Sequence, residues 1–305
     1  MRDYGYRDVD DDEGGAAARG WWDANAGEYL DDHDQFLDGE LRWGPEGLTE
    51  AEAGLLGEVA GRDVLEIGAG AAQCSRWLAA RGARVVATDI SAEMLAHARA
   101  AESSPEPGTS LGERPRGSRQ VVSGDAREPR ARSQNLVAGQ GMGMGRGVGM
   151  GVGVVQADGR RLPFGDGVFD VVFTSFGAIP FVPDAGRVHA EAARVLRPGG
   201  RWVFSVTHPI RWAFPDDPTA AGLTAHRSYF DRRPYVETDD AGRVEYAEYH
   251  RTLGDHVRDV AGAGLRLVDL VEPEWPDWNT GTWGGWGPER GRYLPGTAVF
   301  VTTKE

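Results

Sequence analysis

The sequence predicts an α/β protein built on a mostly parallel β-sheet with helices on both faces. Between residues 62 and 206, short apolar runs alternate with helix-forming stretches, an order that is typical of parallel sheets with right-handed crossovers. The run "VLEI" ends at the glycine turn "GAG" and leads into an alanine-rich stretch. The 305 residues are 40% hydrophobic, which is enough to bury a substantial core.

The first 61 residues precede this alternation. Residues 1–19 are polar, acidic and small, and we expect them to form a disordered tail. Residues 20–61 are expected to form the N-terminal helices. The stretch "WWDANAGEYLDDHDQFL" places apolar side chains near helical spacing, and Thr49 with Glu52 matches a capping box that begins a second helix, running to about Gly61.

Residues 62–206 hold the alternating elements. Ser91 in "TDIS" and Asp184 in "PDAG" are expected to cap helices, and the glycines of "RPGG" are expected to end the second of these helices. The expected strands are 64–67, 83–88, 168–174 and 201–206, and the expected helices are 71–80, 91–101 and 184–196.

A biased segment interrupts this order at residues 103–151. It is rich in Gly, Pro, Ser and Arg and has too little apolar content to fold alone, so we expect a disordered insertion. Two similar stretches, "VVSGDAREP" and "VVQADGRRLP", could each be the third strand with its terminal aspartate. Only the second is followed by a further buried strand, so we choose Asp158 and keep Asp125 as the alternative.

The C-terminal third completes a single predicted domain of residues 20–305. Residues 207–261 are aromatic, proline-rich and irregular before a helix capped by Thr252, and we interpret them as a lid and a helix. Residues 262–305 contain two strands, 266–271 and 297–302, joined by a tryptophan-rich loop. Because no helix separates these strands, we expect an antiparallel pair at the edge of the sheet.

Composition excludes several classes of partner. The formal net charge of −14 disfavours nucleic acid and anionic membranes, whose binding normally begins with a basic surface. No window is long and apolar enough for a membrane span, and the acidic N-terminus lacks the features of a secretory signal. With a single cysteine, Cys74, the sequence predicts a cytoplasmic protein without disulfides, without a metal site and with a small-molecule partner.

Polar side chains gather just after the predicted strands, where ligands of open α/β sheets bind. Three of the five strand tips carry a carboxylate. The tips are residues 66–72, 89–90, 158–159, 174–177 and 207–209.

The glycine turn is a poor match to a dinucleotide site. Gly68 and Gly70 supply two glycines of the pattern G-x-G-x-x-G, but Gln73 stands in the third place, and the nearby Glu66 would repel a pyrophosphate. S-adenosylmethionine has no phosphate and carries two cationic groups, so it suits these acids better. Asp89 lies about twenty residues after the turn, where an acid can accept hydrogen bonds from ribose hydroxyls.

With these motifs the chain resembles the class I S-adenosylmethionine-dependent methyltransferases, in the group similar to the ubiquinone/menaquinone C-methyltransferases. The resemblance rests on "VLEIGAGAAQCSRWLAARGARVVATDIS", "VVQADGRRLPFGDGVFDVVFTSF" and "EAARVLRPGGRWVFSV" and covers most of residues 60–206 apart from the insertion. It implies a Rossmann-like, seven-stranded sheet whose last strand is antiparallel. It also implies that Glu66, Gly68 and Gly70 hold the methionine end and Asp89 the ribose, with Asp158 at the adenine. The full expected cofactor set is Glu66, Gly68, Ala69, Gly70, Asp89, Ile90, Asp158, Gly159 and Thr174.

Methyl transfer is an in-line displacement that depends mainly on the alignment of the reactants. A base is needed only where the acceptor atom, O, N or C, must lose a proton. The candidate base is His208, in "VTHPIRW" at the tip of the fifth strand, and the candidate substrate contacts are His33, Tyr29, Trp212 and Trp283. A protein that only binds or senses S-adenosylmethionine is the main alternative, and a nicotinamide-dependent oxidoreductase is the less favoured one.

Overall fold

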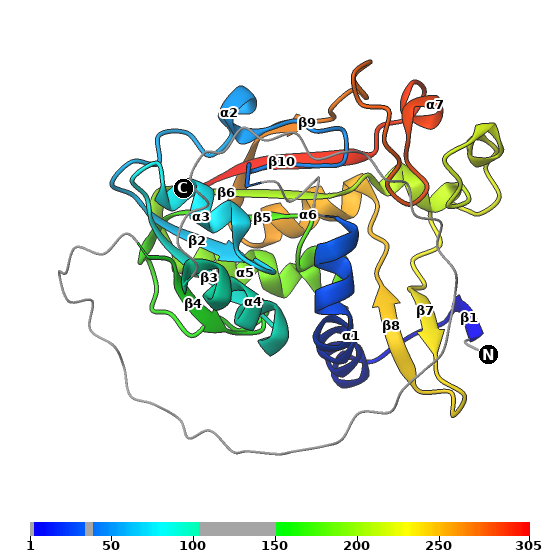
Figure 1. Ribbon diagram of the computed structural model, residues 1–305, viewed down its shortest axis with the longest axis horizontal. Helices are drawn as coiled ribbons and strands as arrows, with labels where there is room; N and C mark the ends of the chain where they lie inside the picture. The colour runs from blue at the N-terminus through cyan, green and yellow to red at the C-terminus, as the bar shows by residue number, and fades with distance from the viewer. Residues whose placement is uncertain (1–2, 34–38, 104–150) are drawn as a thin grey trace. The chain divides into compact units, whose positions relative to one another are not determined.

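A computed structural model describes residues 3–33, 39–103 and 151–305. Most of the predicted insertion, including Asp125, lies outside the described residues. The centre of the fold is a seven-stranded sheet of order β4-β3-β2-β5-β6-β10-β9 (Figure 1). Only β10 runs antiparallel to its two neighbours, which confirms the predicted sheet and its antiparallel last strand. The strands are β2 (Asp63–Ile67), β3 (Arg84–Asp89), β4 (Gly153–Gln156), β5 (Phe169–Ser175), β6 (Leu196–Thr207), β9 (Leu265–Val271) and β10 (Thr297–Lys304).

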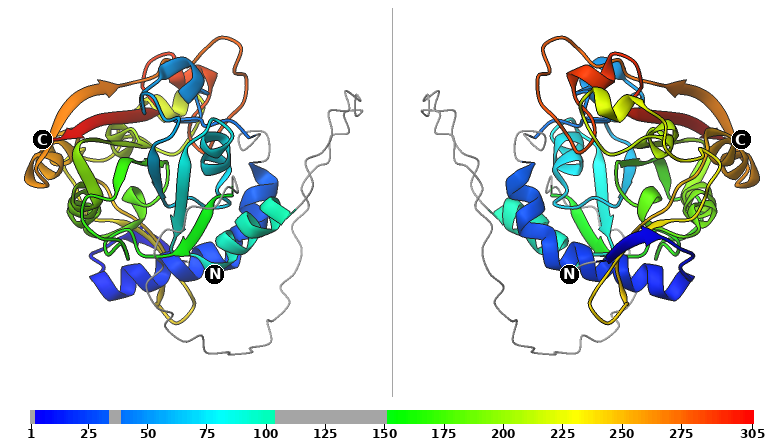
Figure 2. Two further views of the ribbon diagram at one scale, coloured as in Figure 1. Left: turned by 90° about the vertical axis from the view of Figure 1, so that its left-hand side faces the viewer. Right: turned by 90° about the vertical axis from the view of Figure 1, so that its right-hand side faces the viewer.

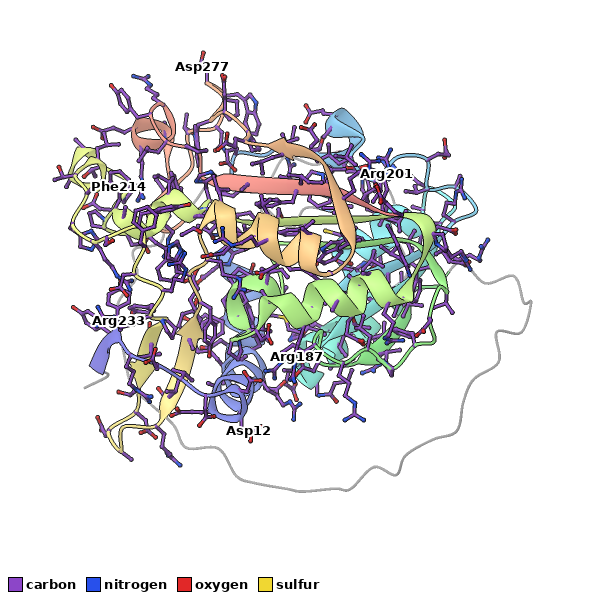
Figure 3. All side chains as sticks on the ribbon, turned by 180° about the vertical axis from the view of Figure 1, so that it is seen from behind. Asp12, Arg187, Arg201, Phe214, Arg233 and Asp277 are labelled. Atoms are coloured by element: carbon purple, nitrogen blue, oxygen red, sulfur yellow. The ribbon has the colours of Figure 1, made fainter. Side chains whose placement is uncertain are left out.

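Helices cover both faces of this sheet. Helices α3 (Gln73–Ala79) and α4 (Ala92–Ser103) pack on one face, and α5 (Ala185–Val195) and α6 (Leu253–Gly262) pack on the other, which faces the viewer in Figure 3. The predicted caps are present: Ser91 Oγ accepts from the backbone of residue 94 at 3.1 Å, and the side chains of Asp184 and Thr252 cap α5 and α6. Local sequence therefore sets the boundaries of these helices.

The N-terminal region is ordered, so the prediction of a disordered tail over residues 1–19 is wrong where the structure describes it. Strand β1 (Asp3–Tyr6) pairs with β7 (Tyr235–Thr238), which pairs with β8 (Val244–Glu248), and these three strands form a second sheet. Helix α1 (Asp11–Asp32) is capped by Asp10, whose carboxylate accepts hydrogen bonds from two backbone N–H groups of the first turn. Composition indicated disorder, but Ala17 of α1 packs against apolar side chains of β7 and β8. The tertiary contact therefore stabilises a segment that looks too polar to fold alone.

Two further segments differ from expectation. The helix after the confirmed capping box, α2 (Glu50–Ala53), ends well before Gly61, because Gly54 adopts a left-handed conformation with φ of 60°. The segment 207–247 was expected to be irregular, but it contains two 3₁₀ helices, η2 (Pro209–Ala213) and η3 (Ala220–Leu223), and most of the β7–β8 hairpin.

Helix α1 lies beside α4 at the carboxyl edge of the parallel strands (Figure 2). Ser91 Oγ donates a hydrogen bond to Asp23 Oδ1 at 2.7 Å across this contact. Across the described parts of the chain, every helix is too short or too polar to pass through a bilayer. The remaining helical elements are η1 (Ile179–Phe181) and α7 (Pro288–Gly291).

Candidate functional site

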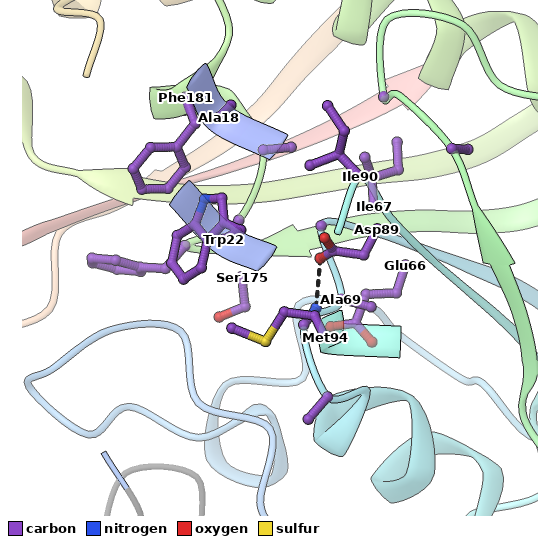
Figure 4. Close-up of a pocket in the computed structure, with 18 of the residues that line it drawn as sticks. Ala18, Trp22, Glu66, Ile67, Ala69, Asp89, Ile90, Met94, Ser175 and Phe181 are labelled. Carbon is purple, nitrogen blue, oxygen red and sulfur yellow. Dashed lines mark hydrogen bonds between the residues drawn. The ribbon is translucent and has the colours of Figure 1, made fainter. Parts of the chain in front are cut away.

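A pocket lies at the carboxyl ends of β2, β3 and β5, and α1 covers it (Figure 4). Together with its open mouth, the space between the lining residues amounts to about 890 Å³. It brings together eight of the nine predicted cofactor residues. Its described lining consists of Ala18, Trp22, Tyr29, Leu30, Glu66, Ile67, Gly68, Ala69, Gly70, Ala71, Gln73, Asp89, Ile90, Met94, Ala157, Asp158, Gly159, Ser175, Phe176, Gly177, Ala178, Phe181 and Val182.

The floor of the pocket is the glycine turn between β2 and α3. Gly68 has a φ of 68°, and a Cβ atom at this position would lie 2.7 Å from the backbone nitrogen of Ala178. Glycine is therefore required both for the left-handed conformation and for the close approach of the loop that follows β5. Gly70 also has a positive φ, of 53°. The two glycines of the sequence thus occupy the two positions of this turn that have a positive φ.

Asp89 ties this turn to the start of α4. Its Oδ2 accepts from the backbone N–H of Gly70 at 2.8 Å, and its Oδ1 accepts from that of Ser91 at 2.9 Å. Burial raises the pKa of this carboxyl, and the backbone hydrogen bonds partly offset the effect. A carboxylate has about four acceptor positions, so each oxygen keeps capacity for a ligand hydroxyl. In Figure 4 the side chain stands in the pocket wall beside the turn.

Glu66 is the most strongly perturbed acid of the pocket. It is 3% exposed, and burial raises its pKa to about 8, although Ser75 Oγ donates a hydrogen bond to its Oε2 at 2.5 Å. The negative charge of Asp89 raises the pKa further. In the same pocket Gln73 Oε1 is buried without a hydrogen-bond partner among the described residues. A cationic group with N–H donors would satisfy both side chains.

Asp158 lines the pocket beside Gly159, but its carboxylate is engaged by Arg160. The Nη2 atom of Arg160 lies 2.8 Å from Asp158 Oδ2, and its backbone N–H donates to Oδ1 at 2.9 Å. Burial alone would raise the pKa of Asp158, but these hydrogen bonds lower it overall. Arg160 also lies 3.8 Å from Asp11 at the start of α1. The predicted adenine acceptor therefore shares its oxygens with a guanidinium that reaches the covering helix.

An aromatic roof faces these acids. Trp22 and Tyr29 come from α1 and Phe181 from η1, and the ring centroid of Trp22 lies 5.1 Å from that of Tyr29 and 5.3 Å from that of Phe181. Both pairs meet edge to face. Burial raises the pKa of Tyr29 to about 12, with a smaller contribution from Cys74, so its hydroxyl is protonated at neutral pH. Sequence reasoning missed Phe181, although it follows the tip of β5, a place where ligand contacts are expected.

Several predicted residues lie outside the pocket lining. His208 is buried; its Nδ1 accepts from the backbone N–H of Ile210 at 3.1 Å, and its Nε2 lies 2.8 Å from Glu272 Oε1. Burial lowers the pKa of His208, with Glu272 acting in the opposite direction. These contacts make it a cap of η2 and not a residue of this pocket. Thr174 is fully buried beneath the lining, and the next residue, Ser175, reaches the pocket instead.

Of the four candidate substrate contacts, only Tyr29 lines the pocket. The ring centroid of His33 lies 4.4 Å from that of Tyr29 and 4.0 Å from that of Trp283, so His33 packs between Tyr29 of the roof and Trp283. Trp212 packs against His250 at 5.3 Å between ring centroids. The tryptophan-rich loop therefore supports the roof, and does not itself line the described cavity.

Two family models, each described as a methyltransferase domain, match residues 64–114 and 116–204. A demethylmenaquinone methyltransferase of Parafrankia sp. (strain EAN1pec) is 38% identical over 169 residues, which cover 54% of this chain and 56% of that relative. The chain spans between 21% and 56% of the lengths of the first curated relatives that it matches.

Solved structures share the fold. An S-adenosylmethionine-dependent methyltransferase from Mesorhizobium loti superposes with a TM-score of 0.56 at 22% identity, over 86% of this chain and 100% of that one. The 1,6-didemethyltoxoflavin-N1-methyltransferase of Burkholderia thailandensis, solved with 1,6-didemethyltoxoflavin and S-adenosylhomocysteine, superposes with a TM-score of 0.52 at 18% identity, over 100% of this chain and 96% of that one.

Proposed function

We propose that this chain, which belongs to the class I S-adenosylmethionine-dependent methyltransferases, transfers a methyl group from S-adenosylmethionine to a small-molecule acceptor. One observation carries the proposal. The pocket at the strand tips combines the glycine turn with Glu66, Asp89 and Asp158, and none of the described residues that line it is Lys, Arg or His. Such a pocket favours a cationic ligand and disfavours a phosphate.

The side chains present fit S-adenosylmethionine group by group. Glu66 and the unpartnered Gln73 Oε1 would hold the ammonium of the methionine end, since both are buried acceptors in one pocket. Asp89 would accept the ribose hydroxyls, and Asp158, which shares its oxygens with Arg160, would face the adenine. The bound compound supplies an activated methyl group on a sulfonium, and the protein's part is to align the acceptor with it.

The roof supports an acceptor with a flat, apolar face. Trp22, Tyr29 and Phe181 present rings to the pocket opposite the acids, where a ring system can stack or meet them edge to face. The acids disfavour an anionic acceptor. The Tyr29 hydroxyl, protonated at neutral pH, would orient the acceptor as a hydrogen-bond donor. The acceptor ring of a demethylmenaquinone and the heteroaromatic ring of 1,6-didemethyltoxoflavin, the compounds in the relatives' names, both have this shape.

Calorimetric titrations with S-adenosylmethionine, S-adenosylhomocysteine and NADH test the cofactor. We expect the first two to bind and NADH to give no heat, because its pyrophosphate would lie against buried carboxylates. Binding of NADH alone would contradict the proposal.

Incubation with methyl-labelled donor and a small-molecule extract tests the reaction. A labelled, extractable product supports transfer. Tight binding of the donor without any labelled product would instead support a protein that binds or senses S-adenosylmethionine.

A further inference from the structure

Helix α1 contains two consecutive glycines, Gly14 and Gly15, although glycine destabilises a helix relative to alanine. A Cβ atom on Gly15 would lie 2.8 Å from Arg160 Nη2, and a Cβ atom on Gly14 would overlap the hydroxyl of Tyr249. Neither glycine has a positive φ, so the backbone alone does not require glycine here. The two glycines therefore leave room for side chains that reach α1 from the loop after β4 and from the end of β8.

Arg160 connects α1 with the pocket at the strand tips. Only 13% of its side chain is exposed. Its Nη2 lies 2.8 Å from Asp158 Oδ2, and its Nη1 lies 3.8 Å from Asp11 Oδ2. Asp158 lines the pocket, and Asp11, which also lies 3.6 Å from the exposed Arg187, is in the first turn of the helix that covers it. One buried cation thus joins an acid of the pocket to the start of the covering helix.

The contacts from Arg160 hold the carboxylate of Asp158 in one orientation. Oδ1 accepts from the backbone N–H of Arg160 at 2.9 Å and from its Nε at 3.1 Å, so both acceptor positions of this oxygen are used. Oδ2 accepts from Nη2 and shares Nε at 3.2 Å, which leaves capacity for one further donor. Burial raises the pKa of Asp158, but these hydrogen bonds and the charges of Arg160 and Arg19 lower it overall, so the carboxyl is ionised at neutral pH. Asp158 therefore offers the pocket one charged acceptor whose direction is fixed before a ligand binds.

We propose that Arg160 is a positioning residue for the adenine end of the cofactor, an inference that rests on the proposed function. By holding Asp158 it presents one carboxylate oxygen to the amino group of the adenine ring. By contacting Asp11 and packing against Gly15 it keeps α1 close to that acid. Arg160 itself is not among the residues that line the pocket, so it acts through Asp158 and α1. A preorganised acceptor favours a ligand that donates an N–H and disfavours one that presents an oxygen at this place.

Titration calorimetry on the full chain with S-adenosylhomocysteine and S-inosylhomocysteine tests this role. The second compound carries hypoxanthine in place of adenine, so an oxygen replaces the amino group. The wild type should bind it about 10-fold more weakly, which is the value of one hydrogen bond to a charged group. In Arg160→Gln the two compounds should bind with nearly the same Kd, because Asp158 is free to turn. A side chain that only stabilised the fold would weaken both compounds alike and leave the ratio of the two Kd values unchanged.

Two matched pairs of variants carry the test. Arg161→Gln removes the same charge from the next residue, which is exposed and does not line the pocket, and it should keep the wild-type ratio. Gly15→Ala keeps every polar group and favours the helix, so we expect it to fold. Its Cβ would displace the guanidinium of Arg160, and the ratio should fall. Gly20→Ala, on the same helix with open space around the new Cβ, should keep the wild-type ratio.

Failure of this role and failure of the proposed function give different results. A wild-type chain that binds neither compound overturns the proposed function and the role of Arg160 with it. A wild-type chain that binds both compounds equally well overturns only the role of Arg160. The same holds if Arg160→Gln keeps the wild-type ratio, or if the two members of either pair change the ratio alike.

Discussion

Substitution of Asp89 by asparagine separates the structural role of this carboxylate from its proposed role with the cofactor. In the free protein the two carboxylate oxygens accept from the backbone N–H groups of Gly70 and Ser91. Asparagine keeps the shape but has one acceptor oxygen, and its NH₂ group would face the other N–H. One charge-assisted hydrogen bond is lost, so the free energy of unfolding should fall by about 2 kcal/mol.

The effect on S-adenosylmethionine should be larger than expected from stability alone. A hydrogen bond from a ribose hydroxyl to a charged acceptor is worth about 1.5–3 kcal/mol, so the Kd should rise roughly 10- to 100-fold. Calorimetry measures the Kd and urea denaturation measures the stability. Asp277→Asn, the same change on an exposed loop (Figure 3), is the matched control. A folded Asp89→Asn variant that binds S-adenosylmethionine as tightly as the wild type would refute the role of Asp89.

Three other outcomes follow from the structure. The pKa of Glu66 is about 8, and only its ionised form pairs with an ammonium, so S-adenosylmethionine should bind more weakly as the pH falls below 8. Titrations at several pH values should show that the Kd of Glu66→Gln depends less on pH than that of the wild type. Gly68→Ala should cost more than 2 kcal/mol of stability in urea, because it adds a backbone clash to a left-handed φ; Gly242→Ala, at a φ of 79° with open space around it, should cost only about 1–2 kcal/mol. Burial lowers the pKa of His189 to about 3, so between about pH 3 and pH 6.5 the unfolded chain binds more protons than the folded chain. The free energy of unfolding should therefore fall by up to about 1.4 kcal/mol for each unit by which the pH is lowered in this range. In His189→Gln, which keeps an acceptor for Trp202, the urea midpoint should fall less over the same range.

Much of the fold and of the cofactor pocket could be predicted from sequence, because both depend on local signals. Gly68 and Gly70 specify a turn within a few residues, and Asp89 follows its strand directly. Parallel strands place their carboxyl ends at one edge, so residues at several tips had to meet. The strand containing "VVQ" pairs with β3, which supports the choice of Asp158 within the described residues.

The sequence by itself determined the alternation of strands and helices, the glycine turn and the acids around it, since each depends on neighbours in the chain. Tertiary structure decided the rest. It ordered the N-terminal helix, placed Phe181 in the roof and turned His208 towards Glu272. The same alanine-rich acidic segment can be disordered or helical, and contacts with β7 and β8, more than 200 positions away along the chain, stabilise the helix. Long-range packing of this kind has no local signature, which is why the covering elements of the site emerge only from the folded chain.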